Sequence, residues 1–451
     1  MVAFQTFAGL VLFLAQSAPV HSLKLDNQDD IVKASESLAS SLIKFYHGNE
    51  SGHIPGLLPE VATNSDKGNG YYWFQSGAFM SSYIDYWQLT GDDTYNDLVS
   101  QGIQWQVGQN DDFMPTNQTK DIGNDDQSIW ALGALTAAEY GFPAPSKTQP
   151  KWLDLAIAVW EEQRLRWDTE VKDEVCDGGL RWQIWTFNNG YDYKSTFANT
   201  LFFNLGARLA KFTANETFAE YAGKTWDWLE AREFINNETW AVYDGAAPSS
   251  NCTKINRIQF SAPSASLAMG AAFMYNYTDG SKEWKDRTES LTASTLKFFF
   301  PKNKGFSEIA CANGGKCPKD LVTYKAFTHR WLAVTSQVAP FTADSILPAI
   351  RRSAEESKTE SKGDDALEQT LGSFAAVSNL LIADTAVPGT RNETTGDKAN
   401  KTEDGPTSSS SSVPSSSSTD ESAGENSAFR LAGPDSFMSI SFLVLAFLWI
   451  L

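Results

Sequence analysis

A polar turn recurs between the apolar segments of this chain and constrains its fold more than any other feature. "LTGDDTYNDL" at 89–98 resembles "FTANETFAEY" at 212–221, and "YTDGSKEWKD" at 277–286 is a third copy, one residue longer. Each copy has a Thr, a short polar turn and an aromatic residue that opens the next segment. "GFPAPSKTQP" at 141–150 and "VAPFTADS" at 338–345 continue the series. The step of roughly sixty residues is the size of a two-helix unit.

Between these turns, apolar residues recur at three- and four-residue steps, and no convincing alternating run indicates a strand. The pattern predicts twelve helices, at 31–46, 75–89, 94–107, 126–140, 151–166, 194–211, 217–231, 260–276, 282–299, 322–338, 341–353 and 367–382. The turns join them into five pairs, and the first and last helices are left to close on each other as a sixth pair. We therefore expect an all-α (α/α)6 toroid of two concentric six-helix rings. A right-handed α-solenoid is the alternative, but its loops would not converge and its ends would need capping repeats.

The connections between the pairs are long, in contrast to the turns within them. In a toroid they emerge on one face of the ring, and loops displayed on a rigid scaffold often carry function. They hold the four cysteines and two adjacent acids, and they span residues 47–74, 108–125, 167–193, 232–259, 301–321 and 354–366.

Both ends of the chain read as targeting segments. An apolar run at 4–15 followed by small residues predicts a cleaved signal peptide over residues 1–22. At the other end, small residues at 426–428, a polar spacer and a terminal apolar run predict a GPI attachment signal over 427–451, removed after Asn426. A tail-anchoring membrane helix is less favoured, because no basic residue follows the apolar run. Residues 23–384 are then the globular domain, and 385–426 a Ser/Thr-rich stalk.

Because the chain is expected to be secreted, its sequons can carry glycans and its cysteines can form disulfides. Eight Asn-X-Ser/Thr triplets are candidate glycosylation sites, at Asn49, Asn117, Asn215, Asn237, Asn251, Asn276, Asn392 and Asn400. Four cysteines suit an oxidising compartment, and the Gly-rich loop between Cys311 and Cys317 favours their pairing, which leaves Cys176 with Cys252. A zinc site is the competing reading, but there is no CxxC motif and His is scarce. We expect no metal and no cofactor.

The formal charge of −19 argues against nucleic acid as a partner. Fifteen Trp in a secreted domain suggest that some of them stack on sugar rings, although core packing is the better expectation for any single Trp. The protein is expected to be a monomer.

Asp125 and Asp126 are expected at the end of a long loop and the start of an inner helix. One carboxylate can cap that helix, whose N-terminus favours an ionised group. The second is then pushed toward staying protonated, because neighbouring anions repel. A glycosidase uses one ionised and one protonated carboxyl group. The short distance expected between the carboxyl groups of adjacent residues favours a retaining mechanism. The alternative is a helix cap and a solvated acid, which is what two adjacent acids alone would suggest.

The surrounding motifs change this balance. "GNDDQSIWALGALTA" resembles the catalytic segment of glycoside hydrolase family 76, the endo-α-1,6-mannanases. The resemblance covers most of residues 30–384 and is to the fungal GPI-anchored branch. It extends over "FYHGNESGHIPGLLP" (45–59), "YYWFQSGAFMSSYIDYWQLTGDDTYN" (71–96), the segment 176–213, "YDG" (243–245) and "YKAFTHRWLA" (324–333).

The resemblance implies the (α/α)6 fold and an enzyme that acts on α-mannan or on the mannose core of GPI glycans, with wall β-glucan as a possible acceptor. It implies a GPI lipid that holds the protein at the cell surface, in plasma membrane or cell wall. Asp125 matches the nucleophile and Asp126 the general acid/base, although the sequence alone does not assign the two parts. Weaker candidates for substrate binding, each with a structural alternative, are Trp73, Gln127, Trp130, Trp182, Trp185, Asn189, Tyr191, Lys194, Asn199 and Asp244.

Two departures from the family pattern bear on substrate preference. The chain has Ala198-Asn199-Thr200 where the family commonly has an "SNG"-like step. It has "SAPSA" at 261–265 where the family commonly has a Tyr-Asn-rich segment. A catalytically weak mannan-binding or adhesive wall protein on the same toroid is therefore the second hypothesis. A lyase is a third, disfavoured because the folded region holds only His47, His53 and His329.

Overall fold

The computed structural model describes residues 23–59, 70–143, 146, 148–172, 176–302, 304–312, 317–357 and 361–396. Both targeting segments, Asn400, Asn426 and the stalk after residue 396 lie outside the described residues. The α-helices are α1 Gln28–Leu42, α2 Trp73–Thr90, α3 Asn96–Trp105, α4 Asn124–Tyr140, α5 Trp152–Lys172, α6 Thr196–Thr213, α7 Glu216–Ala231, α8 Ser261–Tyr277, α9 Lys282–Phe299, α10 Ile309–Ala312, α11 Lys319–Val338, α12 Ala343–Glu355, α13 Ala366–Ser378 and α14 Arg391–Gly396. Four 3-10 helices, η1 Ile43–Phe45, η2 Pro248–Ser250, η3 Pro340–Thr342 and η4 Asn379–Asp384, and three short strands complete the described elements.

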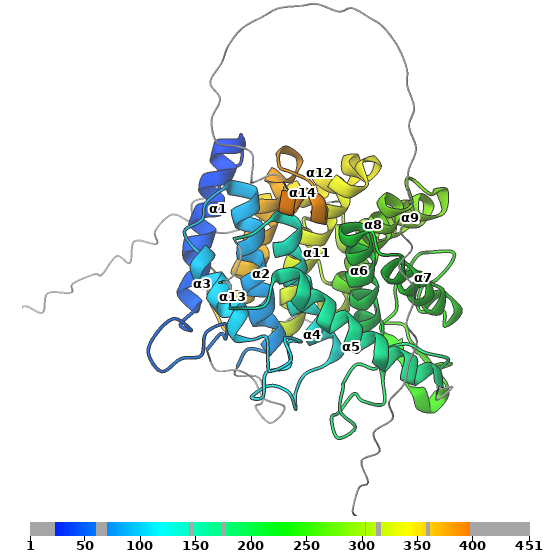
Figure 1. The fold of residues 1–451 in the computed structure, drawn as a ribbon. Coiled ribbons are helices and arrows are strands. Elements are labelled where there is room, and N and C mark those ends of the chain that lie inside the picture. Colours follow the sequence, from blue (N-terminus) through cyan, green and yellow to red (C-terminus); the bar gives the residue numbers. More distant parts are fainter. Residues whose placement is uncertain are drawn as a thin grey trace, which may run out of the picture. The chain divides into compact units, whose positions relative to one another are not determined.

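The contacts among the twelve main helices arrange them in two concentric rings. Figure 1 shows these helices from the side, with α1 at one edge and α7 at the other. In the inner ring α2 packs on α4, followed by α6, α8, α11 and α13, and α13 returns to α2. The outer ring is made of α3, α5, α7, α9, α12 and α1, which all pack on inner helices, and α5, α12 and α1 each contact two of them. All twelve predicted helices are present, and the contact between α13 and α2 closes the ring. The toroid is confirmed and the open solenoid is excluded.

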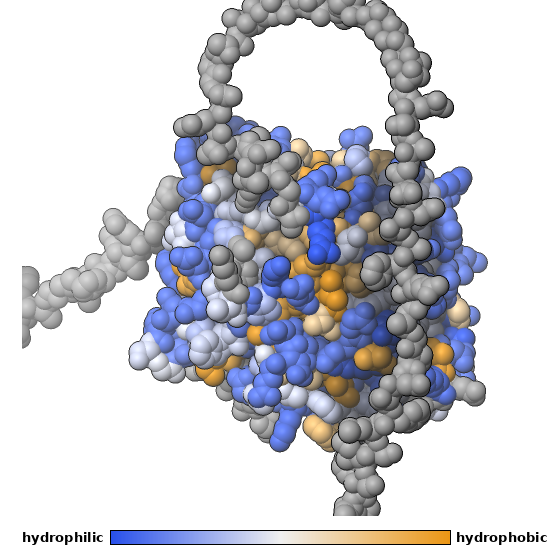
Figure 2. All heavy atoms as spheres, viewed as in Figure 1, coloured by the Kyte–Doolittle hydropathy of each residue, from blue (hydrophilic) through white to orange (hydrophobic). Residues whose placement is uncertain are grey.

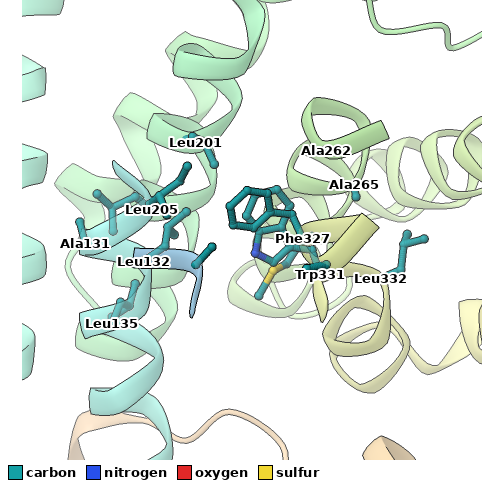
Figure 3. Packing of buried hydrophobic residues seen from close by; sticks show 14 of the residues in the cluster. Ala131, Leu132, Leu135, Leu201, Leu205, Ala262, Ala265, Phe327, Trp331 and Leu332 are labelled. Carbon is teal, nitrogen blue, oxygen red and sulfur yellow. The ribbon is translucent and has the colours of Figure 1, made fainter. Parts of the chain in front are cut away.

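Burial separates the two rings. The inner helix α8 is buried continuously from Ser261 to Met274, because it has neighbours on every side. The outer helix α12 buries only the stripe Ile346, Ala349, Ile350, Ser353 and Ala354. Figure 3 shows apolar side chains of α4, α6, α8 and α11 that meet inside the ring. On the outside, hydrophilic residues predominate on the face shown in Figure 2.

The repeated Thr ends a helix in each copy of the turn. Thr90, Thr213 and Thr278 each donate a side-chain hydrogen bond to the carbonyl four residues earlier. A left-handed residue follows, at Gly91, Ala214 and Asp279. The shared sequence therefore encodes a shared helix stop.

A small antiparallel sheet, which the sequence did not predict, connects two of the long loops. β1 (Lys194–Ser195) pairs with β2 (Gly245–Ala246), which pairs with β3 (Ile255–Asn256). Strands of two residues are too short to show alternation in the sequence. Gly245 has φ +148°, and a side chain there would lie 2.2 Å from the Lys194 carbonyl oxygen. The sheet lies in the loops that precede α6 and α8 and leaves the helical ring intact.

Residues 385–396, within the expected stalk, pack on the face of the ring where the inner helices end. Gln88 of α2 and Gln337 of α11 donate side-chain hydrogen bonds to the Ala386 and Thr385 carbonyls, at 3.1 and 3.0 Å. The Gly389 amide donates to the Glu139 carbonyl of α4 at 3.0 Å. The folded part of the chain therefore continues at least to α14.

Both expected disulfides are confirmed. Cys176 pairs with Cys252 and Cys311 pairs with Cys317, with Cα–Cα distances of 5.6 and 5.2 Å. Both lie in the long loops on the face where the inner helices begin. Within the part of the chain that the structure describes, no helix is both long and apolar enough to cross a membrane.

Candidate active site

A cleft opens on the face where the inner helices begin. Its walls come from the starts of α2, α4, α6 and α11 and from the loops before α4 and α6. The wall residues are Tyr72, Trp73, Phe74, Gln118, Asp121, Ile122, Asp125, Asp126, Ile129, Trp182, Gln183, Asn189, Gly190, Phe197, Asp320 and Tyr324. The long loops thus converge as predicted, and both adjacent acids lie in the cleft.

The first turn of α4 presents the two acids. The Asp125 carboxylate accepts a hydrogen bond from the Asp126 amide at 3.1 Å, and Asp126 Oδ2 accepts one from the Gly123 amide at 2.6 Å. A Cβ atom on Gly123 would lie 2.4 Å from Asp125 Oδ1 and 3.0 Å from Asp126 Oδ2. These two oxygens are therefore no farther apart than about 5.4 Å, the sum of the two distances, which suits the close carboxyl pair of a retaining glycosidase.

The surroundings of the two acids separate their pKa values. Desolvation raises the pKa of Asp125 to about 6, and hydrogen bonds from the Asp126 amide and the Trp182 side chain limit the rise. Desolvation and the neighbouring Asp125 charge raise the pKa of Asp126 well above its usual range, and Asp121 adds to this. Asp125 therefore ionises first, while Asp126 keeps its proton at near-neutral pH.

The cleft is acidic. Asp121 and Asp320 join Asp125 and Asp126 on its walls, and no Lys or Arg lies among the wall residues that the structure describes. Burial raises the pKa of Asp320. The charge of the cleft suits a neutral or cationic ligand better than an anionic one.

The two tryptophans that flank the acids have different positions. Trp73 lines the cleft, and its indole N–H donates to Gln106 at 2.9 Å. Trp130 is 1% exposed and lies against Trp73, with ring centroids 5.2 Å apart, and against Phe113. Trp73 can touch a ligand, whereas Trp130 belongs to the core and supports Trp73 from behind.

Gln127 is fully buried and belongs to a polar cluster that fixes the start of α4 from α5. Its amide donates to the Asp112 carbonyl at 2.8 Å and to Glu162 at 3.1 Å. Arg166 of α5 donates to Gln127 at 2.7 Å and to the Asn124 side chain at 2.8 Å. Gln163 of α5 donates to the Asn124 carbonyl at 2.8 Å. This α5 clamp, made of Glu162, Gln163 and Arg166, holds the turn that carries the acids.

The loop before α6 forms one rim of the cleft. Trp182 and Asn189 line the cleft, and the Trp182 carbonyl accepts from the Asn124 amide at 2.9 Å. Tyr191 faces a neighbouring groove, where the Arg181 guanidinium lies 4.5 Å from its ring centroid. Trp185 lies farther out, with its indole N–H donating to the Thr119 carbonyl.

Three more predicted residues hold this loop and are not among the cleft walls. Buried Lys194 forms an ion pair with Glu170 at 3.1 Å, and burial lowers its pKa to about 8. The Asn199 side chain exchanges hydrogen bonds with the Leu180 backbone. Asp244 accepts from Tyr193 at 2.6 Å and from Asn256 at 2.8 Å. Each supports the loops that shape the cleft.

Several wall residues were not predicted as site residues. Tyr72 and Phe74 flank Trp73 at the start of α2. Asp320 and Tyr324 lie on α11, far from the acids in sequence. The motif "YKAFTHRWLA" begins at Tyr324 and was the available signal. The Asp125 charge contributes to the raised pKa of Tyr324, so these two groups are close in space.

The altered segment 261–265 is buried and is not part of the cleft walls. The Ser261 amide and hydroxyl donate to Glu308 at 3.1 and 2.5 Å, and the Thr328 hydroxyl donates to Ser261. The departure of this segment from the family pattern therefore affects the start of α8 and not the described cleft walls.

Comparisons with known proteins agree with this arrangement. A model described as "Glycosyl hydrolase family 76" matches residues 30–379. Mannan endo-1,6-alpha-mannosidase DCW1 of Saccharomyces cerevisiae is 37% identical over 346 residues, which cover 76% of this chain and 73% of that protein. Mannan endo-1,6-alpha-mannosidase DFG5 of the same yeast is 33% identical over 397 residues, which cover 83% and 84%.

Solved structures extend the likeness. Dfg5 from Chaetomium thermophilum in complex with glucosamine has a TM-score of 0.77 and 43% identity, over 82% of this chain and 95% of that chain. An inactive variant of a Salegentibacter α-1,6-mannanase, with two consecutive aspartates replaced and α-1,6-mannotetrose bound, has a TM-score of 0.61 over 78% and 98%. Its identity of 15% shows a shared fold only.

Proposed function

Because the chain belongs to glycosyl hydrolase family 76, we propose that its cleft cleaves α-1,6-linked mannosides by double displacement on Asp125 and Asp126. The family and the curated relatives identify it as a glycosidase of the mannan endo-1,6-α-mannosidase type, acting as a hydrolase or a transglycosidase. The observation that supports the residue assignment is the close carboxyl pair whose two pKa values differ.

In the first step the ionised Asp125 attacks the anomeric carbon of the mannose, while Asp126 donates its proton to the departing glycosidic oxygen. A covalent mannosyl ester forms on Asp125, and the shortened glycan leaves with the proton. The Trp182 hydrogen bond to Asp125 and the Gly123 bond to Asp126 hold both groups during this step.

In the second step Asp126, now ionised, removes a proton from an incoming hydroxyl, whose oxygen attacks the anomeric carbon and releases Asp125. Water as the attacking group gives hydrolysis, and a sugar hydroxyl gives transfer. The net configuration at the anomeric carbon is retained in both cases.

We further infer the setting of this reaction from the sequence. The mannose core of GPI glycans is the proposed donor, and wall β-glucan is the proposed acceptor. A GPI lipid on Asn426 would keep the enzyme at the outer face of the plasma membrane or in the cell wall. The alternative of a mannan-binding protein with weak or no catalysis had its best support in segment 261–265, which is not among the described cleft walls.

Trapping the intermediate tests this assignment. Asp126→Asn keeps the nucleophile, so with an activated mannoside, whose leaving group needs no proton, it should accumulate a mannosyl adduct. Asp125→Asn should form none. Intact-mass spectrometry measures both, and circular dichroism checks the fold. An adduct on Asp125→Asn, or substantial turnover in both variants, would exclude these acids from the proposed roles.

A further inference from the structure

We propose that Trp185 and Phe187 form a second saccharide-binding subsite at the rim of the cleft, which holds a distal stretch of the chain whose reactive bond lies at Asp125 and Asp126. We call these two side chains the rim platform. The proposal rests on the proposed function, because it takes the same polysaccharide as ligand. It adds a binding site outside the cleft walls and a preference for long chains.

The rim platform is unusual in its exposure. Phe187 is 67% exposed and Trp185 is 36% exposed, whereas most aromatic side chains of the domain are buried. The two rings are parallel within 1°, with centroids 6.2 Å apart. Neither ring belongs to the hydrophobic core, and the two rings lie side by side, so they form an exposed apolar patch of the kind that marks binding surfaces. Parallel flat rings suit pyranose sugars, whose C–H groups pack on the negative face of an aromatic ring.

Hydrogen bonds fix the loop that carries these rings. The Trp185 indole N–H donates to the Thr119 carbonyl at 2.5 Å, which sets the orientation of the indole. The Asn188 amide donates to the Lys120 carbonyl at 2.7 Å and to Gln183 at 3.1 Å. Binding to a platform that is already ordered costs little conformational entropy.

The rim platform is continuous with the cleft through both of the loops that hold it. On its own loop, Gln183, Asn189 and Gly190 line the cleft. On the supporting turn, Gln118 and Asp121 line the cleft on either side of Thr119. The side chain of Asn189 is exposed, and no hydrogen bond to it is found among the described residues. Asn189 can therefore bind sugar hydroxyls between the rim platform and the acids. A glycan chain that extends out of the cleft would then lie on the rim platform.

A chain-length comparison tests this proposal. Phe187→Ala removes the more exposed of the two rings. For linear α-1,6-mannan we expect KM to rise about fivefold with kcat unchanged, because one stacking contact is lost. For α-1,6-mannotriose, short enough to occupy the cleft alone, both constants should stay at the wild-type value. Trp105→Ala is the matched control, since Trp105 is 62% exposed on α3 and is not a wall residue.

An equal rise in KM for both substrates, or an equal effect of Trp105→Ala, would overturn the proposal. The exposed sequon at Asn117 offers another occupant, the chain's own glycan. If Asn117→Gln abolishes the effect of Phe187→Ala, the platform holds that glycan and the proposal is wrong. Electrophoresis of the intact Asp125→Asn chain through gels that contain mannan measures binding without turnover. Retardation that depends on Phe187 supports the platform even if catalysis is absent, so failure of the proposed function is distinguishable.

Discussion

The two acids differ only in what surrounds them. They are adjacent in sequence and on the same helical turn. The indole of Trp182 hydrogen-bonds to Asp125, whereas burial and the charges of Asp125 and Asp121 raise the pKa of Asp126. The helix N-terminus favours an anion, and one negative charge satisfies it. The pair therefore holds one proton over a range of pH.

This proton sharing predicts a bell-shaped pH dependence of kcat/KM. Asp125 must be ionised, so activity should fall as pH drops through about 6, where that carboxylate takes up a proton. Asp126 must be protonated, so activity should fall again at higher pH. Initial rates with a natural mannooligosaccharide measure both limbs. With an activated mannoside the alkaline limb of glycosylation should disappear, and its persistence would assign that limb to another group.

Gly123 should tolerate no side chain. The Cβ of Gly123→Ala would displace both carboxylates and would approach the Trp182 carbonyl within 3.1 Å. We expect kcat/KM to fall about 100-fold or more, because a shift near 1 Å misaligns the reacting groups. Gly223→Ala is the matched control, since the Cβ site at Gly223 on α7 has no neighbour within 4 Å. Equal activity of the two variants would show that the acids do not depend on this close approach.

At this scale the sequence predicted the site unevenly. Asp125, Asp126, Trp73, Trp182 and Asn189 were predicted and lie in the cleft. Asp320 and Tyr324 were not predicted, because their proximity to the acids depends on how α11 is placed across the ring. Lys194 and Asn199 were predicted to bind substrate from their motif, but they hold the loop before α6 in place. A sequence motif alone does not distinguish residues that hold a loop from residues that line the cleft.

Among the elements, the outer helix α5 contributes to the site although it lies outside the inner ring. Its α5 clamp reaches the Asn124 and Gln127 side chains at the start of α4. The apolar periodicity predicted a helix at 151–166, and α5 is a helix from Trp152 to Lys172. The same periodicity carries no information on polar contacts such as these, since it registers only which face is apolar.

The α5 clamp can be tested with two arginines of the same helix. Arg166→Met removes two hydrogen bonds to the first turn of α4, at Asn124 and Gln127, and one to Glu162 of α5. We expect it to lower kcat about tenfold or more with a smaller change in KM. Arg164→Met is the control, because Arg164 pairs with Glu161 and Asp168. Partial recovery of kcat in Arg166→Lys would support positioning. Equal losses in both methionine variants would indicate a general effect on α5.

For the whole domain, sequence periodicity was sufficient to predict the ring. Twelve amphipathic or apolar segments and one repeated turn left two unpaired helices, and closure was the arrangement that buried both. The packing of 385–396 could not be predicted in this way. That segment contributes backbone carbonyls and amides to the ring, whereas Thr, Pro and Gly in its sequence suggest a linker.

A pair of truncations tests this segment. A chain that stops after residue 384 loses the hydrogen bonds to Gln88, Gln337 and Glu139, whereas one that stops after 396 keeps them. We expect Tm to be lower by about 2–5 °C in the shorter chain. Mannosidase activity per folded molecule should be equal, because the segment lies on the face opposite the cleft. Equal Tm values would show that the segment adds no stability.

The pairing of α1 with α13, which closes the ring, also determines when α1 can complete its packing. α1 packs on α13, whose first residue follows the end of α1 by about 320 positions. During synthesis, α1 therefore lacks α13, the helix on which it mainly packs, until almost the whole domain has been made, and its stripe of Ile31, Ala34, Leu38 and Leu42 stays incompletely covered. A nascent chain with such a delay presents an apolar stripe to chaperones for most of its translation, and it is most prone to aggregation before its last helix emerges.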